Sequence, residues 1–143
     1  MNMFSSLLKY QKGRPPADAQ KKAHDQFPKK VSQSKLKLRK PGQPLPSTGR
    51  LFIIGIATFS APELELLDQL EDYLERTETI DVEVFDVLAC KQMNDFAKFI
   101  PGIDAVYRTP IIGVISDGKL IDQATGVSEV VTTLHRFHVL NHS

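Results

Sequence analysis

The stretch "RLFIIGIATFSAPE" (residues 50–63) joins the most hydrophobic run of the chain to the start of a helix. Residues 51–56 are almost continuously apolar, which predicts a strand that is buried on both faces of a sheet. A short loop follows, and Pro62 opens a stripe of leucines that predicts a helix over residues 62–76. Since α/β proteins often place their chemistry where a strand leads into a helix, the segment "FSAPE" is the first candidate site.

The sequence after this stretch continues to alternate between strands and helices. It predicts a strand over 80–87, a helix over 91–100 that ends at Pro101, a hairpin over 110–124 and a helix over 128–138. The pair Asp117-Gly118 suits a type I′ turn in the hairpin. The acidic residues of the 62–76 helix are assigned to its solvent side: Glu63, Glu65, Asp68, Glu71, Asp72 and Glu75. The resulting order, β-α-β-α-β-β-α, predicts an α/β fold with a central mixed sheet flanked by helices.

Charge divides the chain into two unlike parts at about residue 50. Residues 1–50 contain twelve Lys or Arg and two acids, a net charge of +10, whereas residues 51–143 contain six Lys or Arg and fifteen acids, a net charge of −9. Such an asymmetry indicates a basic arm joined to an acidic domain. We therefore divide the chain into residues 1–49 and a domain over residues 50–143.

The basic part, residues 1–49, is poor in large apolar residues and is predicted to be a largely disordered arm or linker. Within it, residues 15–27 have the pattern of a short helix that stops before Pro28. We predict that part of this segment is an arm that docks on a partner. Its contact residues would be three apolar residues at helical spacing and six basic residues: Phe4, Leu7, Leu8, Lys29, Lys30, Lys35, Lys37, Arg39 and Lys40.

The charge of the arm suits several partners. An acidic protein surface, nucleic acid and an anionic membrane would all attract a charge of +10. Aromatic residues are too few among the lysines to favour base stacking. A further interpretation is that the arm lies on its own acidic domain.

Length and composition limit the class of protein. The chain has 143 residues, enough for one ordinary domain, and no apolar stretch approaches the roughly 20 residues that span a bilayer. The single cysteine, Cys90, has no partner for an internal disulfide, which favours a cytoplasmic location. The acid-free, Ser-bearing N-terminus also suits targeting to an organelle matrix.

The predicted order, together with several short segments, resembles the thioredoxin family. "FSAPE" (residues 59–63) falls where that family carries Trp-Cys-Gly-Pro-Cys, and "VYRTPI" (residues 106–111) is similar to the loop that leads to its cis-proline, here Pro110. "ISDGKL" (residues 115–120) is similar to its last hairpin, and "TGVSE" (residues 125–129) to the loop before its last helix. The resemblance implies a thioredoxin-like fold over about residues 50–140.

The resemblance also implies that dithiol-disulfide exchange is absent. Ser60 and Glu63 occupy the two cysteine positions, and neither residue can replace a thiolate or a resolving thiol. Ile54 and Val84 stand where the family buries an Asp and a Lys. Without that chemistry, Ser-x-x-Glu before an apolar helix predicts a capping box, in which Ser60 and Glu63 each bind a backbone N–H group of the first turn.

Other catalytic interpretations have weaker support. Ser60 could activate glutathione, as serine does in some glutathione transferases, but those enzymes carry a further helical domain. Cys90 is interpreted as a half-buried structural thiol, and the i, i+4 pair His138 and His142 as helix-terminal cations. We therefore predict no catalytic residue, no metal site and no cofactor, and keep an enzyme that uses Ser60 or Cys90 as an alternative.

The thioredoxin resemblance implies a groove that binds an extended peptide. Its lining residues here would be Phe59, Ser60, Ala61, Arg108, Thr109, Pro110 and Gly126. The leading hypothesis is a redox-inactive adaptor, assembly factor or subunit of a larger complex, which binds a protein partner through this groove and through the basic arm. The alternatives are a regulatory binding protein similar to the clock protein KaiB and a nucleic-acid-associated protein. KaiB departs from the thioredoxin pattern in its C-terminal half, where this chain follows that pattern.

Overall fold

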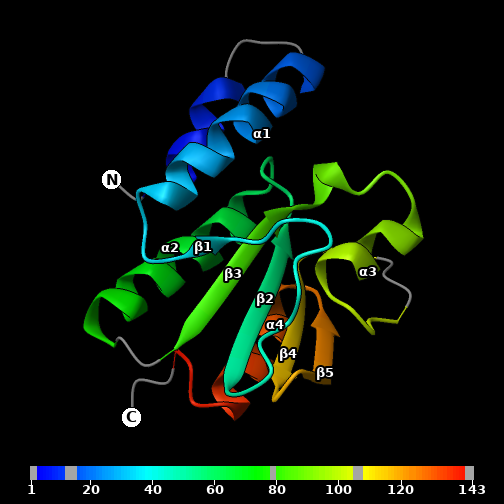
Figure 1. The fold of residues 1–143 in the computed structure, drawn as a ribbon. Coiled ribbons are helices and arrows are strands. Elements are labelled where there is room, and N and C mark those ends of the chain that lie inside the picture. The colour runs from blue at the N-terminus through cyan, green and yellow to red at the C-terminus, as the bar shows by residue number, and fades with distance from the viewer. Residues whose placement is uncertain (1–2, 12–15, 78–79, 105–107, 141–143) are drawn as a thin grey trace.

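A mixed sheet of five strands forms the centre of the molecule (Figure 1). The computed structural model describes residues 3–11, 16–77, 80–104 and 108–140. The strands are β1 (Lys37–Leu38), β2 (Arg50–Ile56), β3 (Asp81–Asp86), β4 (Ile111–Ser116) and β5 (Lys119–Thr125), in the order β1-β3-β2-β4-β5. β3 is parallel to both β1 and β2, and β4 is antiparallel to β2 and β5.

The helices fill the positions that the sequence predicts, with one addition at the N-terminus. They are the 3-10 helix η1 (Ser5–Gln11), α1 (Pro16–Ser32), α2 (Ala61–Arg76), the 3-10 helices η2 (Val87–Ala89) and η3 (Met93–Asp95), α3 (Phe96–Phe99) and α4 (Val127–Arg136). From β2 onward the order β-α-β-α-β-β-α is confirmed. The helix predicted over 91–100 is shorter, because a 3-10 turn with an Asp95 cap replaces its first part.

Strand β2 is buried on both faces, as its apolar run predicts. Phe52, Ile54 and Ile56 belong to one hydrophobic core, which also contains residues of α2, α4 and the N-terminal helices. Leu51 and Ile53 belong to a second core, against α3. Because side chains alternate along a strand, one continuous apolar run supplies both cores. In Figure 1, α4 lies behind the sheet, and α3 lies in front of it.

Two glycines have a geometric role in this sheet. A Cβ atom on Gly55 would lie 2.4 Å from the Phe85 ring, so glycine is what allows that ring to lie against β2. In the hairpin, Asp117 and Gly118 have φ angles of 48° and 82°. Two positive φ angles in succession are those of a type I′ turn, and the predicted turn is confirmed.

The structure differs from the sequence expectation for residues 3–11 and 16–49, which lie on the domain. The predicted short helix exists, but α1 continues past Pro28 to Ser32. A proline inside a helix costs about 3 kcal/mol. Phe27 and Val31, on either side of it, are 1% exposed, and burying two such side chains gains about 1.5–3 kcal/mol each, which offsets that cost.

Acidic residues of α2 hold the N-terminal segment in place. The Asp68 carboxylate accepts hydrogen bonds from the backbone N–H groups of Phe4 (2.7 Å) and Ser5 (3.1 Å) and from the Ser5 hydroxyl. Glu71 accepts from the backbone N–H of Lys35 at 2.6 Å. Assigning Asp68 and Glu71 to the solvent side of α2 was therefore wrong, since both are at most 8% exposed.

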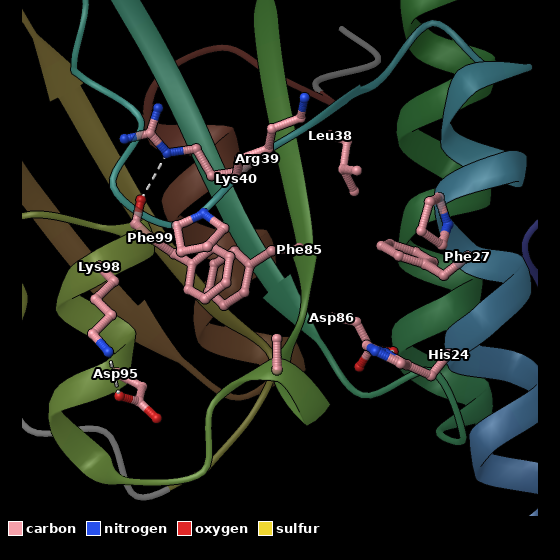
Figure 2. Close-up of a pocket in the computed structure, with 13 residues that line it drawn as sticks. His24, Phe27, Leu38, Arg39, Lys40, Phe85, Asp86, Asp95, Lys98 and Phe99 are labelled. Carbon is pink, nitrogen blue, oxygen red and sulfur yellow. Dashed lines mark hydrogen bonds and ion pairs between the residues drawn. The ribbon is translucent and has the colours of Figure 1, made fainter.

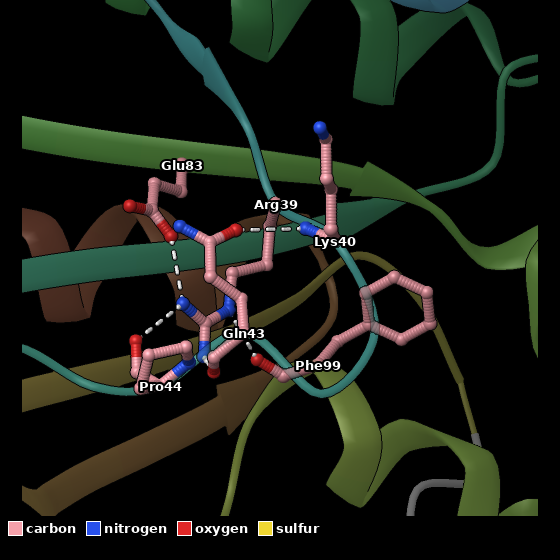
Figure 3. A network of polar contacts seen from close by, with 6 residues as sticks. All are labelled: Arg39, Lys40, Gln43, Pro44, Glu83 and Phe99. Atoms are coloured by element: carbon pink, nitrogen blue, oxygen red, sulfur yellow. Dashed lines mark hydrogen bonds and ion pairs between the residues drawn. The ribbon is translucent and has the colours of Figure 1, made fainter.

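Arg39 fixes the crossover between β1 and β2 (Figure 3). Its guanidinium donates to the carbonyl oxygens of Phe99 (2.8 Å), Gln43 (2.6 Å) and Pro44 (3.3 Å), and to the Glu83 carboxylate (3.0 Å). The Arg39 side chain is fully buried. One side chain thus connects the 39–49 segment to β3 and to the end of α3.

These contacts correct part of the expected docking arm. Phe4 and Leu7 are 0% exposed and pack in the first core, so they are not free to bind a partner, and Leu8 packs partly against the same core. Arg39 is committed to the network of Figure 3. The basic segment therefore lies on its own acidic domain. Residue 50 marks a change in net charge, and the described residues before it are folded as well.

Candidate functional site

The loop after β2 presents one large apolar side chain to solvent. Ala57 and Thr58 are buried, whereas Phe59 is 40% exposed and Ser60 is half-buried. The Ser60 N–H donates to the Ala57 carbonyl at 3.0 Å, which turns the chain into α2. Ala61 begins the helix and is exposed. The loop therefore presents Phe59 at the N-terminal end of α2.

The predicted capping box is wrong. Ser60 precedes α2 in an extended conformation, but its side chain caps no backbone group. Glu63, which is 6% exposed, accepts a hydrogen bond from the Ala57 N–H (3.0 Å) and another from the Thr109 hydroxyl (3.3 Å). Because its carboxylate binds both donors, Glu63 connects the loop after β2 to the loop before β4.

Four residues predicted for the groove come together on the loop before β4 and the turn before α4. The Thr109–Pro110 bond is cis, as the thioredoxin resemblance implies, and the Pro110 carbonyl accepts from the Gly126 N–H at 2.8 Å. The exposed Arg108 guanidinium lies beside Gly126, where an added Cβ would be 3.2 Å from it. Pro110 is buried, and Thr109 and Gly126 are half-buried, so the accessible part is mainly Arg108. Val106 and Tyr107, which carry part of the resemblance, lie outside the described residues.

We call the set of Phe59, Ser60, Ala61, Arg108, Thr109 and Gly126 the loop surface. Glu63 is the residue of this region that the sequence analysis placed incorrectly. Its signal was present, because position 63 lies three and four residues before the buried Leu66 and Leu67, on the same face of α2. The Arg108 side chain donates to the Thr125 hydroxyl at 3.3 Å. Within the part of the chain that the structure describes, no carboxylate lies within ion-pair distance of Arg108.

Two buried positions near the loop surface are apolar. Ile54 and Val84, which occupy the positions where the thioredoxin family buries charged residues, are both 0% exposed. Ser60 and Glu63 stand at the cysteine positions, and the only thiol of the chain is elsewhere. These observations are compatible with a lack of dithiol activity.

Cys90 lies just after η2 and is half-buried, as expected. Burial first, and then the nearby Asp95 and Asp86 carboxylates, together raise the pKa of its thiol to about 11. A thiol with so high a pKa is almost entirely protonated at neutral pH and is a weak nucleophile.

A buried polar group at the end of β3 was not anticipated from the sequence. Asp86 is 5% exposed and accepts from the Thr58 hydroxyl (3.0 Å), from the Leu88 N–H (3.0 Å) and from His24 Nδ1 (2.6 Å). Alternation along β3 contained the signal, since Val82, Val84 and Asp86 share one face. Through Asp86, helix α1 is connected to the residue that precedes Phe59.

The remaining basic residues of the expected docking arm are distributed over the surface of the N-terminal segment. Lys29, Lys35, Lys37 and Lys40 are exposed and Lys30 is half-buried. Lys37 forms an exposed ion pair with Asp81 at 3.3 Å. His142 of the considered histidine pair lies outside the described residues. Across residues 3–11, 16–77, 80–104 and 108–140, no helix is long and apolar enough to cross a membrane, and no three His, Cys, Asp or Glu side chains gather as metal ligands would.

Among known proteins, similarity to this chain is found in solved structures. No protein-family model and no curated protein matches the sequence. Oxidized mitochondrial thioredoxin 3 from Saccharomyces cerevisiae is similar at 22% identity and a TM-score of 0.48, over 63% of this chain and 76% of that one. Thioredoxin from Fasciola hepatica is similar at 18% identity and a TM-score of 0.47, over 64% and 82% of the two chains. Chlamydomonas reinhardtii thioredoxin f2 matches at 12% identity and a TM-score of 0.42, over 80% and 92%.

The topology itself decides the fold. The parallel β2–β3 pair joined through α2, the antiparallel β4–β5 hairpin and the final helix α4 form the predicted arrangement, and β1 adds a fifth strand beside β3 that the sequence analysis did not predict. The C-terminal half follows the thioredoxin pattern, which was the feature that spoke against the KaiB alternative. The chain has a thioredoxin-like fold with a single cysteine and no Cys-x-x-Cys motif.

Proposed function

We propose that the chain is a non-catalytic, thioredoxin-like protein-binding adaptor or complex subunit, and that the loop surface binds an extended, acidic segment of a protein partner. The observation that carries the proposal is that Phe59 and Arg108 are both exposed and lie on two connected loops. Glu63 connects these loops through its hydrogen bonds with the Ala57 N–H and the Thr109 hydroxyl. The single cysteine favours a cytoplasmic or organelle-matrix location for this role.

The chemistry of the partner follows from these two side chains. Phe59 offers an apolar ring that loses water on binding. Arg108 offers a planar guanidinium that binds a carboxylate through two parallel hydrogen bonds. Among the described residues its side-chain partner is the neutral hydroxyl of Thr125, so a ligand carboxylate has no acid there to displace. A segment with an acidic residue close to a large apolar residue would therefore bind best.

The rigidity of the loop surface supports the same proposal. Glu63 fixes the Ala57 N–H and the Thr109 hydroxyl, and the Gly126 N–H is bound to the Pro110 carbonyl. A surface whose loops are held by buried hydrogen bonds loses little conformational entropy when a ligand binds. The exposed lysines of the N-terminal segment would contribute long-range attraction for an acidic partner.

The test is selection of peptides from a random displayed library against the full chain. We expect enriched peptides to carry Asp or Glu near an aromatic or aliphatic residue. Their affinity should fall about tenfold or more in Arg108→Met and in Phe59→Ser, because each change removes one of the two anchors. Lys119→Met, an exposed cation on the hairpin, is the matched control and should bind as the wild type does. Absence of enrichment, or equal binding by all four proteins, would contradict the proposal.

Nucleic-acid binding is the second candidate, since Lys29, Lys35 and Lys40 remain exposed on one segment. It predicts that the affinity for an oligonucleotide falls steeply with salt, and that a triple Lys→Gln variant at these positions loses it. An oligonucleotide that fails to bind at low salt would remove this candidate and leave the peptide-binding proposal untouched.

A further inference from the structure

A second hollow lies away from the loop surface, between α1, the segment after β1 and α3 (Figure 2). It is a cavity of about 320 Å³ that opens to solvent. Ligand pockets begin at about 300 Å³, so this one has room for one small organic molecule. The N-terminal segment supplies roughly half of its wall, from His24 and Phe27 to Arg39, Lys40 and Pro41.

The walls of the cavity are aromatic and aliphatic. Phe85 and Phe99 stack with ring centroids 4.3 Å apart and planes within 8° of each other. Phe27 and Leu38 line the side of α1 and β1. Since Gly55 lets Phe85 lie close against β2, the stacked pair forms a fixed flat wall. A planar apolar body would match this wall better than a branched or strongly polar one.

The carboxylates around the cavity already have donors. Asp86 accepts hydrogen bonds from His24, Thr58 and the Leu88 N–H. Asp95 accepts from the backbone N–H groups of Lys91 and Gln92 and forms an ion pair with Lys98. These bonds hold the pKa of Asp95 below its usual value, the Lys91 bond contributing most. Neither carboxylate therefore calls for a cationic ligand.

The lysines of the rim have donors to spare. Lys40 is exposed, and no ion pair involves it within the described residues. The Lys98 ammonium has three N–H donors, is 64% exposed, and has one acidic contact, Asp95 at 3.2 Å. Figure 2 shows Lys98 on the opposite side of the Phe85 and Phe99 rings from His24. Among the described residues, the rim thus carries one ammonium without an ion pair, that of Lys40, and a second, that of Lys98, which is paired with Asp95.

We propose that this cavity binds a small aromatic carboxylate, with its ring against Phe85 and Phe99 and its carboxylate at Lys40, while Lys98 adds a second positive charge to the rim. His24 closes the far side, because its Nδ1 bond to Asp86 fixes the imidazole ring. The site shares no residue with the loop surface, so the inference goes beyond the proposed function and can fail or succeed separately from it.

The test uses 2-naphthoate and its neutral amide, 2-naphthamide, as probes for the full chain. The chain has no tryptophan, so naphthalene fluorescence can be followed without interference from tryptophan emission. We expect saturable binding of 2-naphthoate and about tenfold weaker binding of the amide, whose neutral carbonyl accepts a hydrogen bond but forms no ion pair with a lysine ammonium. The double variant Lys40→Met/Lys98→Met should bind acid and amide equally.

Two further variants locate the site. Ala89→Phe adds a bulky side chain at the rim and should abolish binding of both probes, whereas Lys119→Met, outside the cavity, should bind as the wild type does. Circular dichroism checks that each variant is folded; if Ala89→Phe is not, the selectivity of the double lysine variant decides. The proposal is overturned if 2-naphthoate does not saturate, if acid and amide bind the wild type equally, or if folded Ala89→Phe or the double lysine variant keeps wild-type behaviour.

Discussion

Arg39 and Arg108 lie on the same domain and have opposite surroundings. The Arg39 side chain is fully buried and donates to three carbonyl oxygens and one carboxylate (Figure 3). Arg108 is exposed, lies beside a glycine and donates to one neutral hydroxyl. The sequence analysis gave both residues a role in binding a partner. Burial and the number of bound acceptors now separate a side chain that holds the fold from one that is available to a ligand.

The same distinction applies to the acidic residues of α2. Asp68 and Glu71 accept hydrogen bonds from the N-terminal segment. Asp72 is exposed and forms no such bond with the described residues. A charge pattern on a helix therefore does not say which members face solvent. Four substitutions test which of these charged side chains stabilise the fold and which can be removed with little loss in the free energy of unfolding.

Arg39→Met should have the largest effect. It leaves Glu83 without its buried partner and removes three hydrogen bonds, so we expect the free energy of unfolding to fall by about 3–5 kcal/mol. Urea denaturation followed by circular dichroism measures this. The double variant Arg39→Met/Glu83→Leu should recover part of the loss, because it removes the orphaned charge. A single-variant loss below about 1 kcal/mol would show that the network adds little.

Asp68→Ala should have the next largest effect. It leaves the buried N–H of Phe4 without an acceptor, which costs about 1–3 kcal/mol. The matched control is Asp72→Ala on the exposed side of α2, expected to lie within about 0.5 kcal/mol of the wild type. Limited proteolysis near residues 3–11 should also become faster only in Asp68→Ala. Equal stability of the two variants would contradict the anchoring role.

Glu71→Gln tests a smaller, pH-dependent effect. Burial raises the pKa of Glu71 above its ordinary value of 4.5, and the Lys35 N–H bond only partly opposes this. The folded state then binds the proton more tightly than the unfolded state, so stability falls as the pH rises from about 4.5 through the raised pKa. The wild type should lose stability relative to Glu71→Gln across that window and match it below. Urea midpoints at several pH values measure the difference, and a pH-independent difference would contradict the assignment.

Arg108→Met should have the smallest effect on stability. Its guanidinium is exposed, so the free energy of unfolding should stay within about 0.5 kcal/mol of the wild type. The same urea experiment as for Arg39→Met gives the direct comparison. A loss comparable to that of Arg39→Met would mean that Arg108 is structural and would remove the basis for assigning it to a ligand.

Much of the fold could be predicted from local signals after residue 50. The apolar run of β2, the leucine stripe of α2 and the Asp117-Gly118 turn are each sufficient to define an element, and their order gives the topology. The N-terminal segment was harder, because its composition resembles that of a disordered chain. Its few apolar residues, Phe4, Leu7, Phe27 and Val31, occupy the core, where four well-placed side chains outweigh a polar average.

The sequence predicted which loops carry the candidate residues but not the hydrogen bonds that hold those loops, and binding of a partner there stays a prediction. Phe59, Arg108 and Gly126 lie where the thioredoxin resemblance implied. The roles of Glu63 and Asp86 depend on partners far away along the chain, at Thr109 and at His24. No local pattern reports a partner of that kind. Helix-capping rules predict that Glu63 binds a backbone N–H group at the start of its own helix. In the folded chain it binds the Ala57 N–H and the Thr109 hydroxyl.

The two-residue strand β1 has a consequence for how the chain is handled. It covers the outer edge of β3, and η1 and α1 cover the apolar faces beside it. A chain that begins at residue 50, where the charge pattern divides, would expose unpaired N–H and C=O groups along β3 together with Val82, Val84 and Leu67. An open apolar edge of this kind is a template for pairing with another copy. We therefore expect the basic segment to shield this edge of the sheet from pairing with a second copy of the chain.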